Sequence, residues 1–389
     1  MALKTLKAES LLRRLSALSI NKYSTVSEAL ELPEEPPVHF RTIESNPVNH
    51  TAQHKGRFYT MPSDIYQKLF AHGGLAGDYV KQVKTFNECS ILVREPALEI
   101  ISYLRNADYS KPVNRFVLYG PLGCGKTLTL AHILHYGHMA QKIIIHTPWI
   151  PNWYRRPKEV ANSITREGFV DLPIDAAAWL VHFKTQNSQL LAHLDLKIGK
   201  DYVWSKRESS KSGSPIIEMI ELGITRLKYA SEVIIALMSE LKEASIAGKC
   251  NTLVIIDGYN SFFTDTTRVF NDNKVMMLPD RVSLTLAFLD ITNYDWCNGS
   301  VVVTVDEMAV KDKKESTLPR YQLGKEGFEH LDPFLPVSVG PYSDAEFYNT
   351  MDYYKDRRWV RDINEEGLQE LKLLSASNAY KLMQLCAPL

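Results

Sequence analysis

A chain of 389 residues with 45% hydrophobic residues is long enough to bury a large core in two or three domains. Lysine plus arginine and aspartate plus glutamate each number 45, so the net charge is zero and indicates no strongly charged partner. No apolar run reaches the roughly 18–20 residues of a membrane span, which argues against an integral membrane protein.

The first 22 residues differ in composition from the rest. They hold five basic residues and one acid, and Leu11, Leu15 and Leu18 would share one face of a helix. Such an amphipathic, basic segment is similar to a mitochondrial presequence, and a frayed basic terminus is the alternative. Its removal takes five positive charges and one negative charge from a neutral chain, which leaves about −4. That charge does not favour nucleic-acid binding through bulk electrostatics.

A stretch rich in proline and glutamate follows. Residues 31–40, ELPEEPPVHF, contain three prolines and three glutamates and lack the apolar content that folding requires. We therefore expect an extended amino-terminal tether over 23–75 and a nucleotide-binding α/β domain with a helical insertion over 76–340. A helix is expected within 92–104, begun or interrupted at Pro96.

Short apolar runs predict the strands of a parallel sheet. The first four runs are apolar at both parities, as is typical of strands buried on both faces. The five predicted strands cover residues 115–120, 142–147, 252–257, 300–306 and 334–339. Helical patterns separate them, and the longest covers 214–248, with Ser214 as a plausible N-cap and Gly248 as a stop. This alternation predicts an open α/β sheet.

Only helical patterns follow the last predicted strand. They cover 343–356, 364–374 and 377–386, and they predict a helical lid over 341–389.

The stretch RFVLYGPLGCGKTLTLAHIL, residues 115–134, contains the pattern G-x-x-x-x-G-K-[ST] between a predicted strand and a predicted helix. Glycine lets the backbone wrap closely around a phosphate with its N–H groups pointing inward. Lys126 would reach the β- and γ-phosphates, and the Thr127 hydroxyl would coordinate Mg²⁺. The positive end of the following helix adds to the attraction. The loop therefore predicts nucleotide binding.

Asp257 ends the predicted strand TLVIID, where a carboxylate can hold Mg²⁺ directly or through water. An ordinary Asp–Gly turn is the alternative. The next residue, Gly258, lacks the side chain that many ATPases use to polarise the attacking water, although Asn260 could orient a water. Thr304 would either contact the γ-phosphate or bond to backbone at the end of its strand. The pattern favours holding a nucleotide over fast turnover.

Two further patterns leave alternatives open. His132, His135 and His138 are spaced for one helical face, which suits packing against the sheet or a metal site without other nearby ligands. Tyr202 and Trp204 alternate with basic residues, which suits stacking on RNA, docking on a protein, or a solvated loop with two anchored aromatics.

The chain resembles the death-associated protein 3 family, the GTP-binding proteins of the mitochondrial small ribosomal subunit, over nearly all of its length beyond the amino terminus. The stretches that carry this resemblance are QVKTFNECSILVREPALE (82–99), YGPLGCGKTL (119–128), YVWSKRESSKSGSP (202–215), GITR (223–226) and LGKEGFEHLDPF (323–334).

The resemblance implies an AAA+-like P-loop domain with a parallel sheet and a C-terminal helical lid. It implies a structural role in the mitochondrial matrix, within the small ribosomal subunit, among its proteins and ribosomal RNA and close to the large subunit across the intersubunit face. It implies bound GTP or GDP with Mg²⁺ and support of mitochondrial translation. The family also has a glycine after the aspartate that Asp257 matches, and with Gly258 in that place we expect at most slow GTP hydrolysis. No N-K-x-D motif reads guanine, so the base rests on the resemblance. The alternative is an active GTPase or ATPase switch in ribosome assembly or apoptotic signalling, and no residue supports the apoptotic link.

The residues expected to bind the nucleotide combine the two motifs with the positions that match the family's phosphate loop. They are Gly120, Gly123, Cys124, Gly125, Lys126, Thr127, Leu128, Asp257 and Thr304. Thr127 and Asp257 are the expected metal ligands, and no catalytic residue is predicted.

Overall fold

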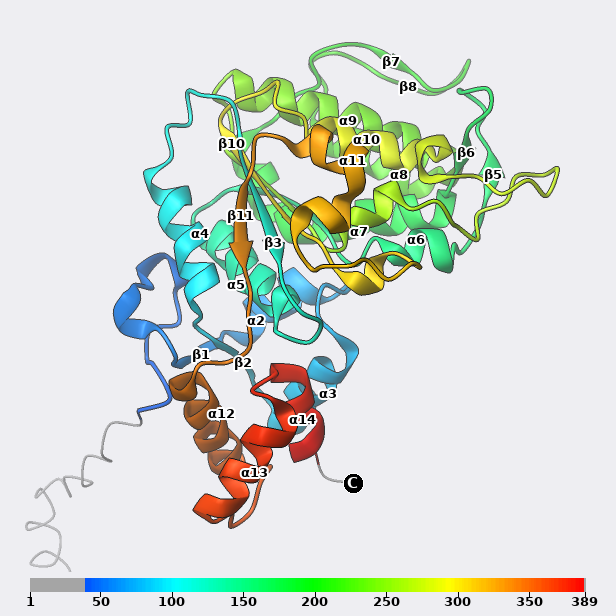
Figure 1. Ribbon diagram of the computed structural model, residues 1–389. Coiled ribbons are helices and arrows are strands. Elements are labelled where there is room, and N and C mark those ends of the chain that lie inside the picture. Colours follow the sequence, from blue (N-terminus) through cyan, green and yellow to red (C-terminus); the bar gives the residue numbers. More distant parts are fainter. Residues whose placement is uncertain (1–38, 388–389) are drawn as a thin grey trace, which may run out of the picture. The chain divides into compact units, whose positions relative to one another are not determined.

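A five-stranded parallel sheet forms the centre of the computed structural model, which describes residues 39–387 (Figure 1). Its strands are β3 (Asn114–Tyr119), β4 (Ile143–Thr147), β9 (Thr252–Ile256), β10 (Gly299–Thr304) and β11 (Leu335–Ser338). They lie in the order β11-β3-β10-β9-β4, and every neighbouring pair is parallel. The five predicted strands and the α/β fold class are confirmed. The predicted presequence and residues 23–38 of the predicted tether lie outside the described residues.

Helices cover both faces of this sheet. One face carries α7 (Pro173–Leu194), α8 (Ile216–Thr225), α9 (Ala230–Ile246) and α10 (Ser283–Ile291), and the other carries α4 (Glu95–Asn106) and α5 (Lys126–Met139). Successive strand residues alternate between the two cores: Ile143 and Ile145 pack on one side and Ile144 on the other. This double burial explains why the strands are apolar at both parities.

The single helix expected over 214–248 is wrong. The chain leaves the helical conformation at Arg226, and the separate helices α8 and α9 pack against each other. Gly223 permits this contact, because a Cβ there would lie 2.5 Å from Leu180 Cδ1 and 2.8 Å from Val233 Cγ1. The longest described helix is instead α7, with 22 residues. Among the described helices, none is long and apolar enough to cross a membrane.

The expectation of an extended tether is wrong for residues 40–75. Strand β1 (Phe58–Met61) pairs antiparallel with β2 (Cys89–Leu92), and α2 (Ser63–Phe70) follows it. Tyr59 and Leu69 are fully buried in the same core as α5. The proline-rich composition is confined to residues 31–40. Tyr59 and Leu69 pack against residues that lie far along the chain, and a local sequence pattern does not reveal such contacts. Helix α3 (Gly77–Phe86) then leads into β2.

The three carboxy-terminal helices are confirmed as α12 (Asp344–Asp356), α13 (Glu365–Ser375) and α14 (Ala379–Cys386). Local sequence fixes where they begin: Ser343 and Glu346 form a capping box at α12, and asparagine side chains cap α13 and α14. Phe347 and Met351 of α12 share a core with Phe58 of β1. The lid therefore packs on the segment that was expected to be a tether.

Both edges of the central sheet are covered or interrupted. At the β4 edge, the Asn187 side chain of α7 accepts from the Ile144 amide and donates to the Ile144 carbonyl, each at 2.8 Å. At the opposite edge, β11 contains Pro336, which has no amide hydrogen to offer.

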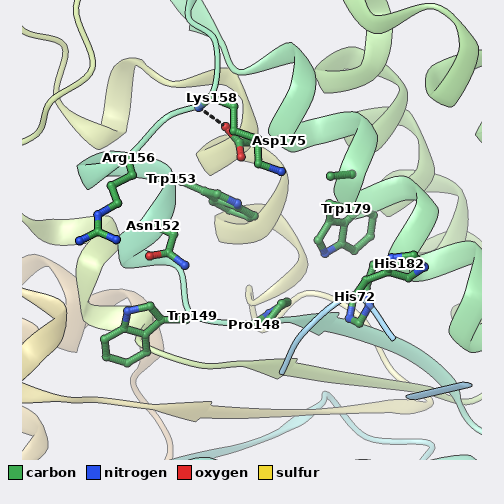
Figure 2. Close-up of a pocket in the computed structure, with 11 residues that line it drawn as sticks. His72, Pro148, Trp149, Asn152, Trp153, Arg156, Lys158, Asp175, Trp179 and His182 are labelled. Carbon is green, nitrogen blue, oxygen red and sulfur yellow. Dashed lines mark hydrogen bonds between the residues drawn. The ribbon is translucent and has the colours of Figure 1, made fainter. Parts of the chain in front are cut away.

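A cavity of about 340 Å³ lies beyond the carboxyl end of β4 (Figure 2). Residues of the loop after β4, of α6 (Pro151–Arg155) and of α7 line it. Ligands of open α/β sheets generally bind outside the carboxyl ends of the strands, and the phosphate loop lies at the same edge of the sheet.

Candidate functional site

The phosphate loop joins β3 to α5 and depends on its glycines. Gly120 has a φ of 144° and Gly123 a φ of 80°, values that residues with a side chain rarely adopt. A Cβ at Gly120 would lie 2.2 Å from the Val339 carbonyl oxygen, and one at Gly123 would lie 2.7 Å from Asn378 Oδ1. The glycines therefore allow β11 and the lid to approach the loop closely.

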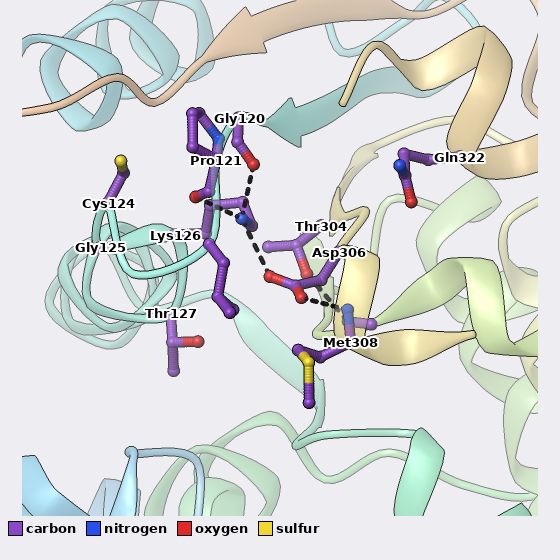
Figure 3. A network of polar contacts seen from close by, with 12 residues as sticks. Gly120, Pro121, Cys124, Gly125, Lys126, Thr127, Thr304, Asp306, Met308 and Gln322 are labelled. Atoms are coloured by element: carbon purple, nitrogen blue, oxygen red, sulfur yellow. Dashed lines mark hydrogen bonds and ion pairs between the residues drawn. The ribbon is translucent and has the colours of Figure 1, made fainter. Parts of the chain in front are cut away.

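Lys126 begins α5, and its ammonium group lies inside the loop with only 5% of the side chain exposed (Figure 3). It donates to the carbonyl oxygens of Gly120 at 2.8 Å and Pro121 at 3.1 Å, and it forms an ion pair with Asp306 Oδ2 at 2.9 Å. Each ammonium proton thus has an acceptor. Asp306 was not predicted at the site. It lies two residues beyond Thr304, at the end of the same predicted strand, and this position could have indicated that its carboxylate lies near Lys126.

Thr127 and Asp257, the two predicted metal ligands, lie together. The Thr127 hydroxyl donates to Asp257 Oδ2 at 2.8 Å, and the Thr304 hydroxyl donates to Oδ1 at 2.5 Å. Thr304 also accepts the Gly258 amide at 2.8 Å, so it bonds to backbone as well as to the carboxylate. Burial raises the pKa of Asp257, against the opposing effect of the two hydroxyl bonds.

These groups fit a polyphosphate with Mg²⁺. A hydroxyl and a carboxylate supply the oxygen ligands that Mg²⁺ prefers, and the buried Lys126 supplies positive charge beside them. The raised pKa of Asp257 also fits, because a divalent cation would stabilise its buried negative charge. When bound, Mg²⁺ would neutralise part of the phosphate charge.

The position after Asp257 has no room for a catalytic side chain. A Cβ on Gly258 would lie 2.9 Å from Pro151 Cδ and 3.3 Å from two ring carbons of Trp149. Gly258 also has a φ of 78°. The Asn260 amide, considered above for orienting a water, instead accepts the Asp306 amide at 3.1 Å and donates to the Asp306 carbonyl at 2.9 Å. Position 258 therefore offers no side chain to activate a water, and the Asn260 amide is already bonded to the Asp306 backbone.

The lid and one arginine hold the outside of the phosphate loop. Asn378 donates to the Leu122 carbonyl at 2.8 Å, and the Tyr380 amide donates to the Gly123 carbonyl at 3.0 Å. Arg94 donates to the Cys124 carbonyl at 2.7 Å. These groups were missed because they lie far from the loop in sequence and no local pattern marks them.

Two predicted loop residues serve the core. The Cys124 side chain is 1% exposed, and Leu128 is half-buried against the core around α5. Their side chains therefore face the protein, so any contact to a phosphate at these positions would come from the backbone.

The side chains of the two patterns that left alternatives open, the histidines of α5 and the aromatic pair Tyr202 and Trp204, pack against neighbouring residues. His132 and His135 are buried beside Tyr59, and His132 Nε2 lies 2.9 Å from His50 Nδ1. Burial lowers the pKa of His135 to about 3, and residues 39–387 contain no group of three or more His, Cys, Asp or Glu side chains placed to hold a metal ion. The rings of Tyr202 and Trp204 stack on each other, with centroids 5.5 Å apart.

Comparison with known proteins identifies the family. The family model for mitochondrial ribosomal death-associated protein 3 matches residues 91–385. The small ribosomal subunit protein mS29 of Mus musculus is 36% identical over 360 residues, which cover 92% of this chain and 91% of that protein. The protein of the same name from Bos taurus is 37% identical over 351 residues, covering 89% and 87%.

Similarity to solved structures is weaker. The Aeropyrum pernix ORC2 protein in its ADP form has a TM-score of 0.36 at 15% identity, covering 77% of this chain and 65% of that one. Because this score is low, the fold assignment rests on the parallel sheet and the phosphate loop. The match to the family model and to its mammalian members confirms the resemblance carried by the sequence. The chain belongs to the mitochondrial ribosomal death-associated protein 3 family.

Proposed function

We propose that the protein is a structural component of the mitochondrial small ribosomal subunit that holds a guanine nucleotide with Mg²⁺ and supports translation in the matrix. The names of the mammalian relatives support the ribosomal role. The observation that carries the nucleotide role is the joining of three parts of the chain at the phosphate loop. Three consecutive carbonyls of the loop accept hydrogen bonds from outside it. Two of these bonds come from the lid, from Asn378 and Tyr380, and the third comes from Arg94.

A nucleotide in this loop would act as a stabilising ligand. Its phosphates would bind the inner face of the loop while the lid holds the outer face, so binding would favour the arrangement in which both are ordered. A ligand that binds only the folded state, at about 1,000 times its dissociation constant, adds roughly 4 kcal/mol of stability. That is a large part of the 5–15 kcal/mol typical of a folded domain.

The same geometry disfavours rapid turnover. Trp149 and Pro151 occupy the space beside Gly258, and the Asn260 amide is bonded to the backbone of Asp306. An active switch would need a partner to supply a catalytic group in trans. The guanine base itself is proposed from the family resemblance, since the phosphate-loop contacts do not distinguish bases.

Sedimentation of small subunits from mitochondrial extract in high salt tests the whole proposal. Nucleotide extracted from the washed particles should be GTP or GDP, in an amount equal to this protein. Cross-linking of intact ribosomes should also join the protein to the large subunit. Particles that contain the chain but no nucleotide would contradict the nucleotide role, and absence of the chain from the particles would contradict the ribosomal role.

The purified protein gives a second test. Lys126→Ala should abolish the rise in Tm that GTP and Mg²⁺ produce, and Lys313→Ala in the exposed loop 311–315 should keep it. The rise with ligand is the readout, because Lys126→Ala also leaves Asp306 without its ion pair. An unchanged rise in the Lys126 variant would refute the placement of the phosphates.

A further inference from the structure

The cavity beyond β4 shares no lining residue with the phosphate-loop site. Its volume, about 340 Å³, lies at the lower end of the range of small-ligand sites. The residues that give it chemical character are three tryptophans, two cations and an amide: Trp149, Trp153, Trp179, Arg156, Lys158 and Asn152. Figure 2 shows Trp149 beside Pro148 and Trp153 on another side of the cavity.

The indole rings are rigid walls. The Trp179 ring is held by hydrogen bonds from its N–H to the His146 carbonyl at 3.0 Å and to Thr147 Oγ1 at 3.2 Å. The Trp153 ring packs against Phe288, with centroids 5.3 Å apart, and is only 7% exposed. A planar ligand would therefore meet preformed aromatic surfaces and cost little side-chain entropy.

One of these walls carries an unused hydrogen-bond donor. The Trp153 indole N–H has no acceptor among residues 39–387, although the side chain is more than nine-tenths buried and lines the cavity. The indole nitrogen is not among the fully buried unpaired atoms of residues 39–387, so a ligand acceptor or water in the cavity can reach it. The exposed Asn152 side chain adds a donor and an acceptor at the same cavity.

The cavity also carries excess positive charge. Arg156 and Lys158 are exposed, and neither forms an ion pair within the described part of the chain. Asp175 is the carboxylate that lines the cavity; it accepts the Lys158 backbone amide at 3.0 Å, and burial raises its pKa. Two free cations beside one buried acid favour a ligand with negative charge.

We infer that this cavity binds one nucleotide of a single-stranded RNA, with the base against the tryptophans and the adjacent phosphates on Arg156 and Lys158. RNA-binding proteins commonly stack splayed bases on aromatic rings and bind their edges by hydrogen bonds. An acidic peptide would satisfy the cations, and its oxygens could accept from the Trp153 N–H, but it has no planar base to lie against the aromatic walls. The choice of an RNA chain over a free nucleotide rests on the ribosomal role proposed above.

Fluorescence anisotropy with a labelled single-stranded RNA of about 12 nucleotides tests this site in the full chain. Trp153→Phe keeps an aromatic side chain, although a smaller one, and removes the N–H donor, so affinity should fall about 2- to 12-fold, as for one hydrogen bond. The double variant Arg156→Glu and Lys158→Glu should lose at least as much. The matched control, Lys313→Glu with Lys314→Glu, makes the same charge change in an exposed loop and should bind nearly as tightly as the wild type.

Photo-cross-linking of the same RNA carrying thiouridine supplies a second readout and should modify residues within 149–158. Equal weakening by the control variant, wild-type affinity of both cavity variants, or cross-links only elsewhere would overturn the inference. Competition by a free mononucleotide as effective as that by the RNA would also overturn it. These results are independent of sedimentation, so a protein that remains in the small subunit with unaffected cavity variants refutes this site alone.

Discussion

Replacement of Arg94 should destabilise the protein more than loss of any surface ion pair. Arg94 Nε lies 2.9 Å from Glu346 Oε1 and its Nη2 lies 3.2 Å from Oε2, and the two side chains are 10% and 7% exposed. The same guanidinium donates to the carbonyls of Cys124, Gly340 and Pro341. One side chain therefore bonds to the phosphate loop, to the segment after β11 and to the first helix of the lid.

The expected cost follows from this burial. Arg94→Met would leave the Glu346 carboxylate buried without its cation, a change that typically costs about 3–5 kcal/mol. The double variant with Glu346→Gln should recover part of the loss, because the amide is neutral and can still accept the Ser343 amide. The exposed pair of Arg226 and Glu208, 2.6 Å apart, is the matched control and should cost about 0–1 kcal/mol.

Urea unfolding followed by circular dichroism, without nucleotide, would measure these differences. The single variants, the double variant and Arg226→Met should be compared at equal denaturant slope, so that the midpoints report stability. If Arg94→Met costs no more than Arg226→Met, the lid is not held by this arginine. If Glu346→Gln does not relieve the loss, the cost arises from the carbonyl contacts and not from the stranded carboxylate.

Three further variants test the phosphate-loop site. In the absence of nucleotide, Asp257→Asn should be more stable than the wild type at pH 7 and equal to it below about pH 4 in urea titrations. The raised pKa means that the folded state binds the proton more tightly, so this carboxyl lowers stability as pH rises above its ordinary pKa. Asp306→Asn should lower the Tm of the free protein and enlarge the rise with GTP, because the Lys126 ammonium loses a competitor of phosphate; an unchanged rise would show no competition. Gly258→Glu should destabilise the fold by about 1–3 kcal/mol or more, since φ is positive and the Cβ would contact Pro151. It should not increase phosphate release from GTP, and an increase would refute the view that this space is filled.

Local sequence patterns were sufficient to predict those strands and site residues whose residue types are determined by burial or by a motif. The strand VVVT around β10 is apolar at both parities because both of its faces are buried, and the loop before Lys126 needs glycine for its backbone. Asp257 and Thr127 were found because their types and positions suit magnesium. These features can be read within a few residues of sequence.

Features that depend on distant contacts could not be read in this way. Strand β1 is stabilised by β2, which begins 28 residues after β1 ends, and the close packing of α8 depends on Gly223, where a Cβ would meet Leu180 of another helix. The bonds from Arg94 and Asn378 to the phosphate loop likewise join segments that are remote in sequence. A single sequence contains no pattern that shows which residues distant along the chain will contact each other.

The two edge strands of the central sheet are poorly suited to pairing with strands of other proteins. The Asn187 amide bonds to β4 at one edge, and β11 contains a proline at the other. Free strand margins invite other polypeptides to pair with them, and these two residues remove bonding positions at each margin. Neighbours in a crowded particle must then attach through helices and loops, not by lengthening the sheet. A leucine in place of Asn187 would leave the Ile144 amide and carbonyl without partners, while the Trp179 N–H would still bond to the His146 carbonyl of the same strand, so this edge would be only partly opened to another strand.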